Sequence, residues 1–178
     1  MKEKRLKGRR AYLCGAIDRV ADRGKGWRED ITPMLHDMGV IVWNPLTKPI
    51  EIGAEDDDTH TVKNKLKKSG RYDELSDMMK TIRNVDLRMV DVCDFMIVNI
   101  NIEHHACGTY EEIFLANRQK KPIIIHMEQG KENTPDWLFG AIPHHMIFSK
   151  WVDIKDYLVY IDSAESIETY KRWYFFDL

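Results

Sequence analysis

The sequence lacks the features of a membrane-spanning, secreted or disulfide-rich protein. No apolar run among its 178 residues approaches the roughly 18 to 20 that a bilayer-spanning helix needs, so we expect no membrane association. The basic residues 1–10 precede only a short apolar stretch, Ala11–Ala16, which does not match a signal peptide. The three cysteines are far apart and form no C-x-x-C pair, which disfavours a disulfide framework or structural zinc. We therefore expect a cytoplasmic protein.

The sequence also lacks an excess of charge of either sign. It has 27 Lys and Arg against 29 Asp and Glu, for a formal net charge of −2. A protein that binds nucleic-acid polymers needs a cationic excess to displace phosphate counterions, so such a partner is not expected. A pocket for a single nucleoside or nucleotide is compatible with this balance. The length fits one domain over residues 1–178.

Short apolar or β-branched runs alternate with segments of helical periodicity. The strands are expected at residues 11–14, 40–43, 95–99, 122–125 and 146–148. The helices are expected at residues 27–38, 71–92, 110–118, 154–161 and 165–170. This alternation predicts an α/β protein whose parallel sheet is covered on both faces. Ligands of such sheets bind beyond the carboxyl ends of the strands, where residues 15–26, 99–112 and 126–140 would meet.

Two segments depart from this alternation. Residues 46–68 carry an acidic block, Glu55–Asp58, and a basic block, Lys63–Lys68, with little periodicity. We interpret them as a solvated, charged insertion or flap. The chain ends in the aromatic tail Trp173–Leu178, and an apolar terminus of this kind usually docks on a surface.

The segment that holds most candidate catalytic groups is Asn101–Ala116. Gly108 and Thr109 open a helix there, and Glu111 and Glu112 lie in its first turn. One interpretation is structural, with Thr109 as the helix cap and the carboxylates complementing the helix dipole. The other makes one glutamate a nucleophile or base at the edge of the sheet. Glu112 follows Gly108 by one helical turn, whereas Glu111 points roughly 100° away.

The loop after the first strand offers basic side chains and glycines. Arg19, Arg23, Lys25 and Arg28 could hold a phosphate, and the glycines would let the backbone approach a ligand. No G-K-[ST] motif is present, so this is not a Walker loop. The alternative is a flexible surface loop. The histidine pairs lack metal-ligand spacing, and we expect no metal site.

Several of these motifs together resemble a known family. Tyr12–Gly15 on the first strand, Asp86 before the third strand, Gly108–Ile113 and the strand Lys121–Ile125 resemble the nucleoside 2-deoxyribosyltransferases. The resemblance covers about residues 11–150 and extends to the related deoxynucleoside monophosphate N-glycosidases. It implies a flavodoxin-like or Rossmann-like three-layer α/β sandwich with a central, mostly parallel five-stranded sheet. It also implies cleavage of a deoxyribosyl N-glycosidic bond without a cofactor.

The resemblance also implies roles for individual residues. Glu112 corresponds to the nucleophile that attacks the anomeric carbon, Asp86 to the aspartate that handles the base or sugar, and Tyr12 to the tyrosine that hydrogen-bonds the glutamate. Substrate contacts are expected from Gly15, Arg19, Arg28, Gly108, Thr109, Asn133 and Asp136. Homo-oligomers, dimers or larger, are implied, with sites completed by a neighbouring subunit and with the aromatic tail at the interface.

The sequence departs from the family at Ala106, where the transferases usually carry an aspartate and the phosphate-accepting glycosidases a small polar residue. Glu103, His104 or His105 could supply the missing polar group. Three hypotheses follow. The protein is a deoxyribosyltransferase acting on deoxynucleosides, a hydrolase of deoxynucleoside 5′-monophosphates, or a nucleotide-binding module without turnover.

Overall fold

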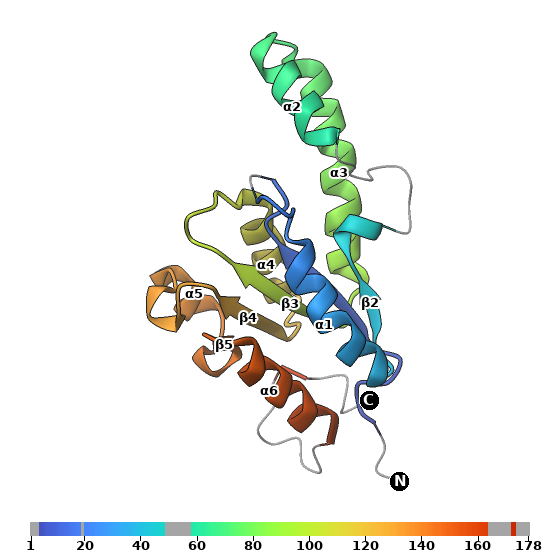
Figure 1. The fold of residues 1–178 in the computed structure, drawn as a ribbon, viewed down its shortest axis with the longest axis vertical. Coiled ribbons are helices and arrows are strands. Elements are labelled where there is room, and N and C mark those ends of the chain that lie inside the picture. The colour runs from blue at the N-terminus through green and yellow to red at the C-terminus, as the bar shows by residue number, and fades with distance from the viewer. Residues whose placement is uncertain (1–3, 19, 49–57, 164–171, 174–178) are drawn as a thin grey trace.

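The centre of the protein is a five-stranded, entirely parallel sheet with strand order β2-β1-β3-β4-β5 (Figure 1). The computed structural model describes residues 4–18, 20–48, 58–163 and 172–173. The strands are β1 (Arg10–Gly15), β2 (Ile41–Trp43), β3 (Phe95–Ile100), β4 (Ile123–Met127) and β5 (Ile147–Phe148). The predicted α/β class and parallel sheet are confirmed.

Helices cover both faces of this sheet, as predicted. The α-helices are α1 (Lys25–Asp37), α2 (Thr59–Lys68), α3 (Tyr72–Val92), α4 (Cys107–Arg118), α5 (Asp136–Ala141) and α6 (Trp151–Ser163). Short 3-10 turns are η1 (Pro45–Thr47), η2 (Lys131–Asn133) and η3 (His144–Met146). Within the described residues, no helix has both the length and the apolar character needed to cross a bilayer.

Side-chain contacts identify the two helical layers. On one face, Trp27 of α1 stacks on Trp151 of α6 with ring centroids 5.3 Å apart. On the other face, where α3 and α4 lie (Figure 1), Arg83 of α3 forms an ion pair with Glu111 of α4. Because both faces are covered, β3 and β4 are buried along their whole length, which explains why their residues are apolar apart from Asn99 and His126.

The strand order creates a natural place for a ligand. The chain leaves β1 toward β2 on one side and leaves β3 toward β4 on the other, so the loops after β1 and β3 diverge. Gly15 and Asn99 are paired at the carboxyl ends of these two strands. In open α/β sheets, the crevice at such a switch point is the usual binding site.

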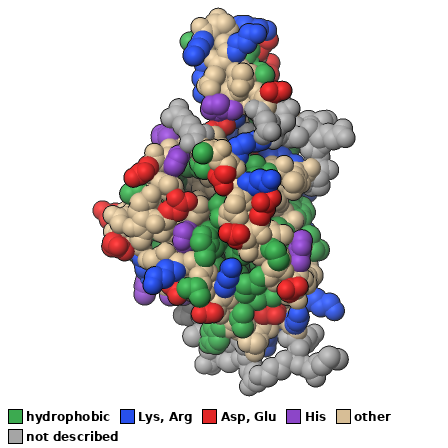
Figure 2. Space-filling view, viewed as in Figure 1, with side chains coloured by type: hydrophobic (Ala, Val, Ile, Leu, Met, Phe, Trp, Pro, Cys, Tyr) green, Lys and Arg blue, Asp and Glu red, His purple; other side chains and the backbone are tan. Residues whose placement is uncertain are grey.

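Residues 59–68, interpreted from the sequence as part of a solvated, charged insertion, form helix α2. Helix α2 packs beside α3, and the two project beyond the sheet, where Lys and Arg side chains gather (Figures 1 and 2). The buried residues of α2 are Thr59, Lys63 and Leu66. They follow the i, i+4, i+7 spacing of a buried helical face, but two of the three are polar. Hydrophobic periodicity therefore could not detect this helix.

The one described aromatic residue of the C-terminal tail docks on the chain itself. Trp173 is 1% exposed, and its ring centroid lies 5.3 Å from that of Phe95 on β3. Its indole nitrogen donates a hydrogen bond to the Tyr157 hydroxyl at 3.0 Å. The rest of the tail and the helix predicted at residues 165–170 lie outside the described residues.

Candidate active site

A cavity of about 280 Å³ opens beyond the carboxyl end of β1, between η1, α3 and the first turn of α4. Six of the predicted site residues line it: Tyr12, Gly15, Asp86, Gly108, Thr109 and Glu112. The structure therefore brings together residues from three separate parts of the sequence, on β1, α3 and α4. Each was proposed from the sequence, but only the fold shows that they share one space.

The Glu112 carboxylate is held at this cavity by two donors from β1. Its Oε1 accepts a hydrogen bond from the Tyr12 hydroxyl, and its Oε2 accepts one from the Cys14 thiol, each at 2.8 Å. Tyr12 and Cys14 are two residues apart on a strand, so their side chains point to the same face. Glu112 is 8% exposed. One strand thus orients both oxygens of a buried carboxylate.

The surroundings of Glu112 change its acidity. Burial raises the pKa of its carboxyl group from 4.5 to about 7, and the negative charge of Asp86 adds to that rise. The hydrogen bonds from Cys14 and Tyr12 act in the opposite direction. Burial and the charge of Glu112 raise the pKa values of Tyr12 and Cys14 well above their ordinary values, so both remain protonated donors. Near neutral pH, Glu112 is divided between its acid and its carboxylate.

The neighbouring Glu111 has a different environment. Its carboxylate lies on the surface, in the ion pair with Arg83, and it does not line the cavity. The hydrogen bond from Arg83 lowers its pKa. The two glutamates thus point in different directions from α4, and Glu112 is the one beside the cavity.

The start of α4 differs from the capping arrangement considered above. The helix begins at Cys107, with Ala106 as the capping residue and no side-chain cap hydrogen bond. Thr109 therefore lies within the first turn, where it is buried and lines the cavity. The interpretation of Thr109 as the helix cap is wrong.

Two further carboxylates line the cavity, and each is bound by a lysine. Asp86 of α3 lies 2.8 Å from the ammonium nitrogen of Lys48. Asp18, in the loop after β1, accepts hydrogen bonds at 2.8 and 2.9 Å from Lys63 of α2. Burial alone would raise the pKa of Asp18, but Lys63 and His60 hold it below its usual value. Sequence reasoning assigned a role to Asp86 only.

Arg28, predicted to bind substrate, does not line this cavity. It is fully buried, and its guanidinium donates to the backbone carbonyls of Leu13, Gly24 and Gly15 at 2.8 to 3.2 Å. Gly24 has φ +68°, and a Cβ atom there would lie 2.5 Å from an Arg28 nitrogen. Arg28 thus stabilises the loop after β1 on the side away from the cavity. The loop is therefore a folded element of the site.

The remaining predicted contacts lie elsewhere. The Asn133 side chain donates to the Gln129 carbonyl at 2.6 Å, and Asp136 begins α5; neither lines the cavity. Arg19 lies outside the described residues. Among the three polar residues considered beside Ala106, His105 lines the cavity. His104 instead lines an adjoining cavity of about 220 Å³.

Cys14, Asp18, Lys48 and Lys63 are the residues of this site to which the sequence gave no role. For Cys14 a signal existed, because the period of a strand places it on the same face as Tyr12. Asp18 and the lysines had no local signal, since their pairing depends on how α2 packs. Over the described part of the chain, no group of three or more His, Cys, Asp or Glu side chains could hold a metal ion.

Comparison with known proteins finds solved structures with a similar fold. No protein-family model and no curated protein matches this chain. The structure is similar to that of a 2-deoxyribosyltransferase from Bacillus psychrosaccharolyticus, with a TM-score of 0.54 and 18% identity over 83% of this chain and 91% of that one. At this identity the similarity establishes a shared α/β fold.

Two further solved structures are more distant. A CMP N-glycosidase from Clostridium botulinum has a TM-score of 0.49 and 20% identity, over 86% of this chain and 99% of that one. A 2-deoxyribosyltransferase from Leishmania mexicana has a TM-score of 0.46 and 16% identity, over 68% of this chain and 66% of that one.

Proposed function

We propose that this protein is a nucleoside 2-deoxyribosyltransferase in which Glu112 is the nucleophile. The observation that carries the proposal is the buried Glu112 carboxylate, fixed by Tyr12 and Cys14 beside a cavity. The sequence resemblance to this family and the fold shared with one of its solved members support it.

The residues present suit this chemistry. As the C1′–N bond of a 2′-deoxynucleoside breaks, positive charge develops on the sugar, and a nearby carboxylate stabilises it. One Glu112 oxygen then bonds to C1′, and the departing base keeps the electron pair and takes up a proton. In the second step, a nitrogen of another base attacks C1′, loses a proton and releases the carboxylate. The sugar lacks the 2′-hydroxyl, which makes the cationic transition state easier to reach.

The charges around the cavity favour an unphosphorylated substrate. Among its described lining residues, the ionisable groups are mainly the carboxyls of Asp18, Asp86 and Glu112, and none is Lys or Arg. The dianionic phosphate of a nucleotide would meet like charge there. Arg28, a candidate from the sequence for holding such a phosphate, is directed at backbone carbonyls instead. These observations favour deoxynucleosides over deoxynucleoside monophosphates.

Product analysis tests the proposal. The protein is incubated with a 2′-deoxynucleoside, with and without a second nucleobase, and the products are separated by chromatography. We expect a new deoxynucleoside only when the second base is present. Release of deoxyribose 5-phosphate from a monophosphate without an acceptor base would instead identify a hydrolase. Absence of any product from either substrate class would support a non-catalytic binding module.

A further inference from the structure

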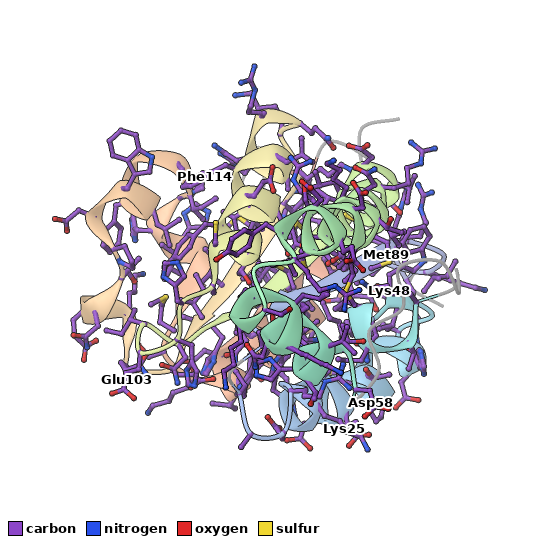
Figure 3. The ribbon with its side chains drawn as sticks, turned by 90° about the horizontal axis from the view of Figure 1, so that it is seen from above. Lys25, Lys48, Asp58, Met89, Glu103 and Phe114 are labelled. Carbon is purple, nitrogen blue, oxygen red and sulfur yellow. The ribbon has the colours of Figure 1, made fainter. Side chains whose placement is uncertain are left out.

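The segment between β2 and α3, which the sequence presents as an insertion, supplies two buried cations next to the cavity. Lys48 follows η1 and lies beside α3 in the view from above (Figure 3); its side chain has 0% exposure. Lys63, on α2, has a side chain that is 5% exposed. Lysine is seldom buried to this degree unless a charge partner compensates its lost hydration.

Each of these lysines is paired with a carboxylate that lines the cavity. Lys48 approaches Asp86 to 2.8 Å, and Asp86 is a side chain whose charge acts on Glu112. Lys63 approaches both oxygens of Asp18. The lysines stand behind the carboxylates, since Asp18 and Asp86 line the cavity and Lys48 and Lys63 do not. The arrangement repeats at two places, on α3 and on the loop after β1.

This geometry determines what the carboxylates can do. An aspartate paired with an ammonium group stays ionised and has a fixed orientation, so it offers hydrogen-bond acceptors and no donor. Without the lysines, three carboxyl groups around one cavity would repel one another. The groups of a nucleoside that match such acceptors are the N–H groups of the base and the hydroxyls of the sugar.

We propose that Lys48 and Lys63 are positioning residues of the nucleoside site, which hold Asp86 and Asp18 as ionised acceptors for the N–H and O–H groups of the substrate. The proposal rests on the proposed function for the identity of the substrate. It gives Lys48, after η1, and Lys63, on α2, a part in forming the site, because each holds a carboxylate that lines the cavity.

The test measures binding apart from turnover. In a Glu112→Gln background, the dissociation constant for 2′-deoxyadenosine is measured by calorimetry for Lys48→Met, Lys63→Met and the matched control Lys65→Met. Lys65 is an exposed lysine on the same helix as Lys63. We expect about tenfold weaker binding for the first two variants and no change for the control. Lys63→Arg should restore binding, because a guanidinium can also hold a carboxylate through two hydrogen bonds.

A double-variant cycle separates positioning from general structural damage. If Lys48 acts through Asp86, adding Lys48→Met to Asp86→Asn weakens binding no further. Equal losses in the presence and absence of the Asp86 carboxylate would overturn the proposal, as would unchanged binding in Lys48→Met and Lys63→Met. Circular dichroism and thermal unfolding report whether each variant is folded.

The outcomes distinguish this proposal from the proposed function. Weakened nucleoside binding in the lysine variants of a protein that releases no base would support the positioning role and contradict catalysis. Normal binding in the lysine variants of a protein whose turnover depends on Glu112 would contradict the positioning role and leave the transferase intact.

Discussion

Glu111 and Glu112 show how strongly position determines the chemistry of identical side chains. Glu111 lies on the surface with Arg83, whereas Glu112 is buried between β1 and the cavity. We expect Glu112→Gln to reduce base release by at least about a thousandfold, because a nucleophile is removed. Glu111→Gln is the matched control and should retain activity within a few fold. Comparable losses in both variants, measured by chromatography of released base, would contradict the assignment.

The hydrogen bond from Cys14 to Glu112 predicts how kcat/KM changes with pH in Cys14 variants. In the proposed mechanism Glu112 attacks as a carboxylate, so kcat/KM should rise with pH through about 7, the pKa of its carboxyl group. The Cys14 hydrogen bond lowers that pKa. Cys14→Ala removes the donor and should move the acidic limb of the profile to higher pH, whereas Cys14→Ser keeps a donor and should move it less. An acidic limb at the same pH in all three proteins would argue against this role.

The raised pKa of Glu112 also predicts that this residue lowers the stability of the folded protein. Its pKa in the folded protein, about 7, is above the ordinary 4.5, so the folded state binds more protons between these values. Glu112 therefore lowers stability as the pH rises through this range, by up to roughly 3 kcal/mol above pH 7. Glu112→Gln should be more stable than the wild type at pH 8 and closer to it at pH 4. Urea unfolding at both pH values measures this, and an equal difference at both would contradict it.

Among the elements, the loop between β1 and α1 depends on Arg28. Its buried guanidinium donates to the backbone carbonyls of Leu13, Gly15 and Gly24, so Arg28→Met should destabilise the protein by roughly 3 kcal/mol. Lys25→Met, on an exposed side chain at the start of the same helix (Figure 3), should change stability little. Thermal unfolding of the two variants tests this. Full stability of Arg28→Met, with a loss confined to nucleotide binding, would instead support a phosphate-binding role.

The elements also show where sequence reasoning succeeded. Strands β1, β3 and β4 were predicted because burial on both faces gives an apolar run such as residues 95–98. Helix α2 was missed because its buried face contains Lys63, whose burial depends on Asp18, 45 residues away. Arg28 was misassigned for a related reason. A basic side chain in a glycine-containing loop has the same local pattern whether it faces a ligand or its own backbone.

At the scale of the whole molecule, the sequence predicted which residues share a site better than it predicted what surrounds them. Tyr12, Asp86 and Glu112 converge as expected, because the fold brings β1, α3 and the N-terminal part of α4 together. The lysine partners could not be predicted, since they depend on the path of the chain between β2 and α3. Such a path is set by packing over long sequence separations.

The assembly state remains a prediction at this scale. The resemblance to the deoxyribosyltransferases implies a homo-oligomer, dimer or higher, with sites completed across subunits. Light scattering coupled to size-exclusion chromatography should give a mass of at least twice the 21.0 kDa of one chain. A monomer with full transferase activity would show that a single chain contains a complete site.

The two donors to Glu112 occupy alternate positions of one strand, and this makes the site sensitive to strand register. If β1 slipped by one residue relative to α4, Leu13 would replace a donor, and the carboxylate would lose both partners at once. A partly folded form with β1 out of register would therefore lose both hydrogen bonds to Glu112, and we expect it to be inactive. Catalytic competence should appear as a single cooperative event with the docking of α4 on the sheet.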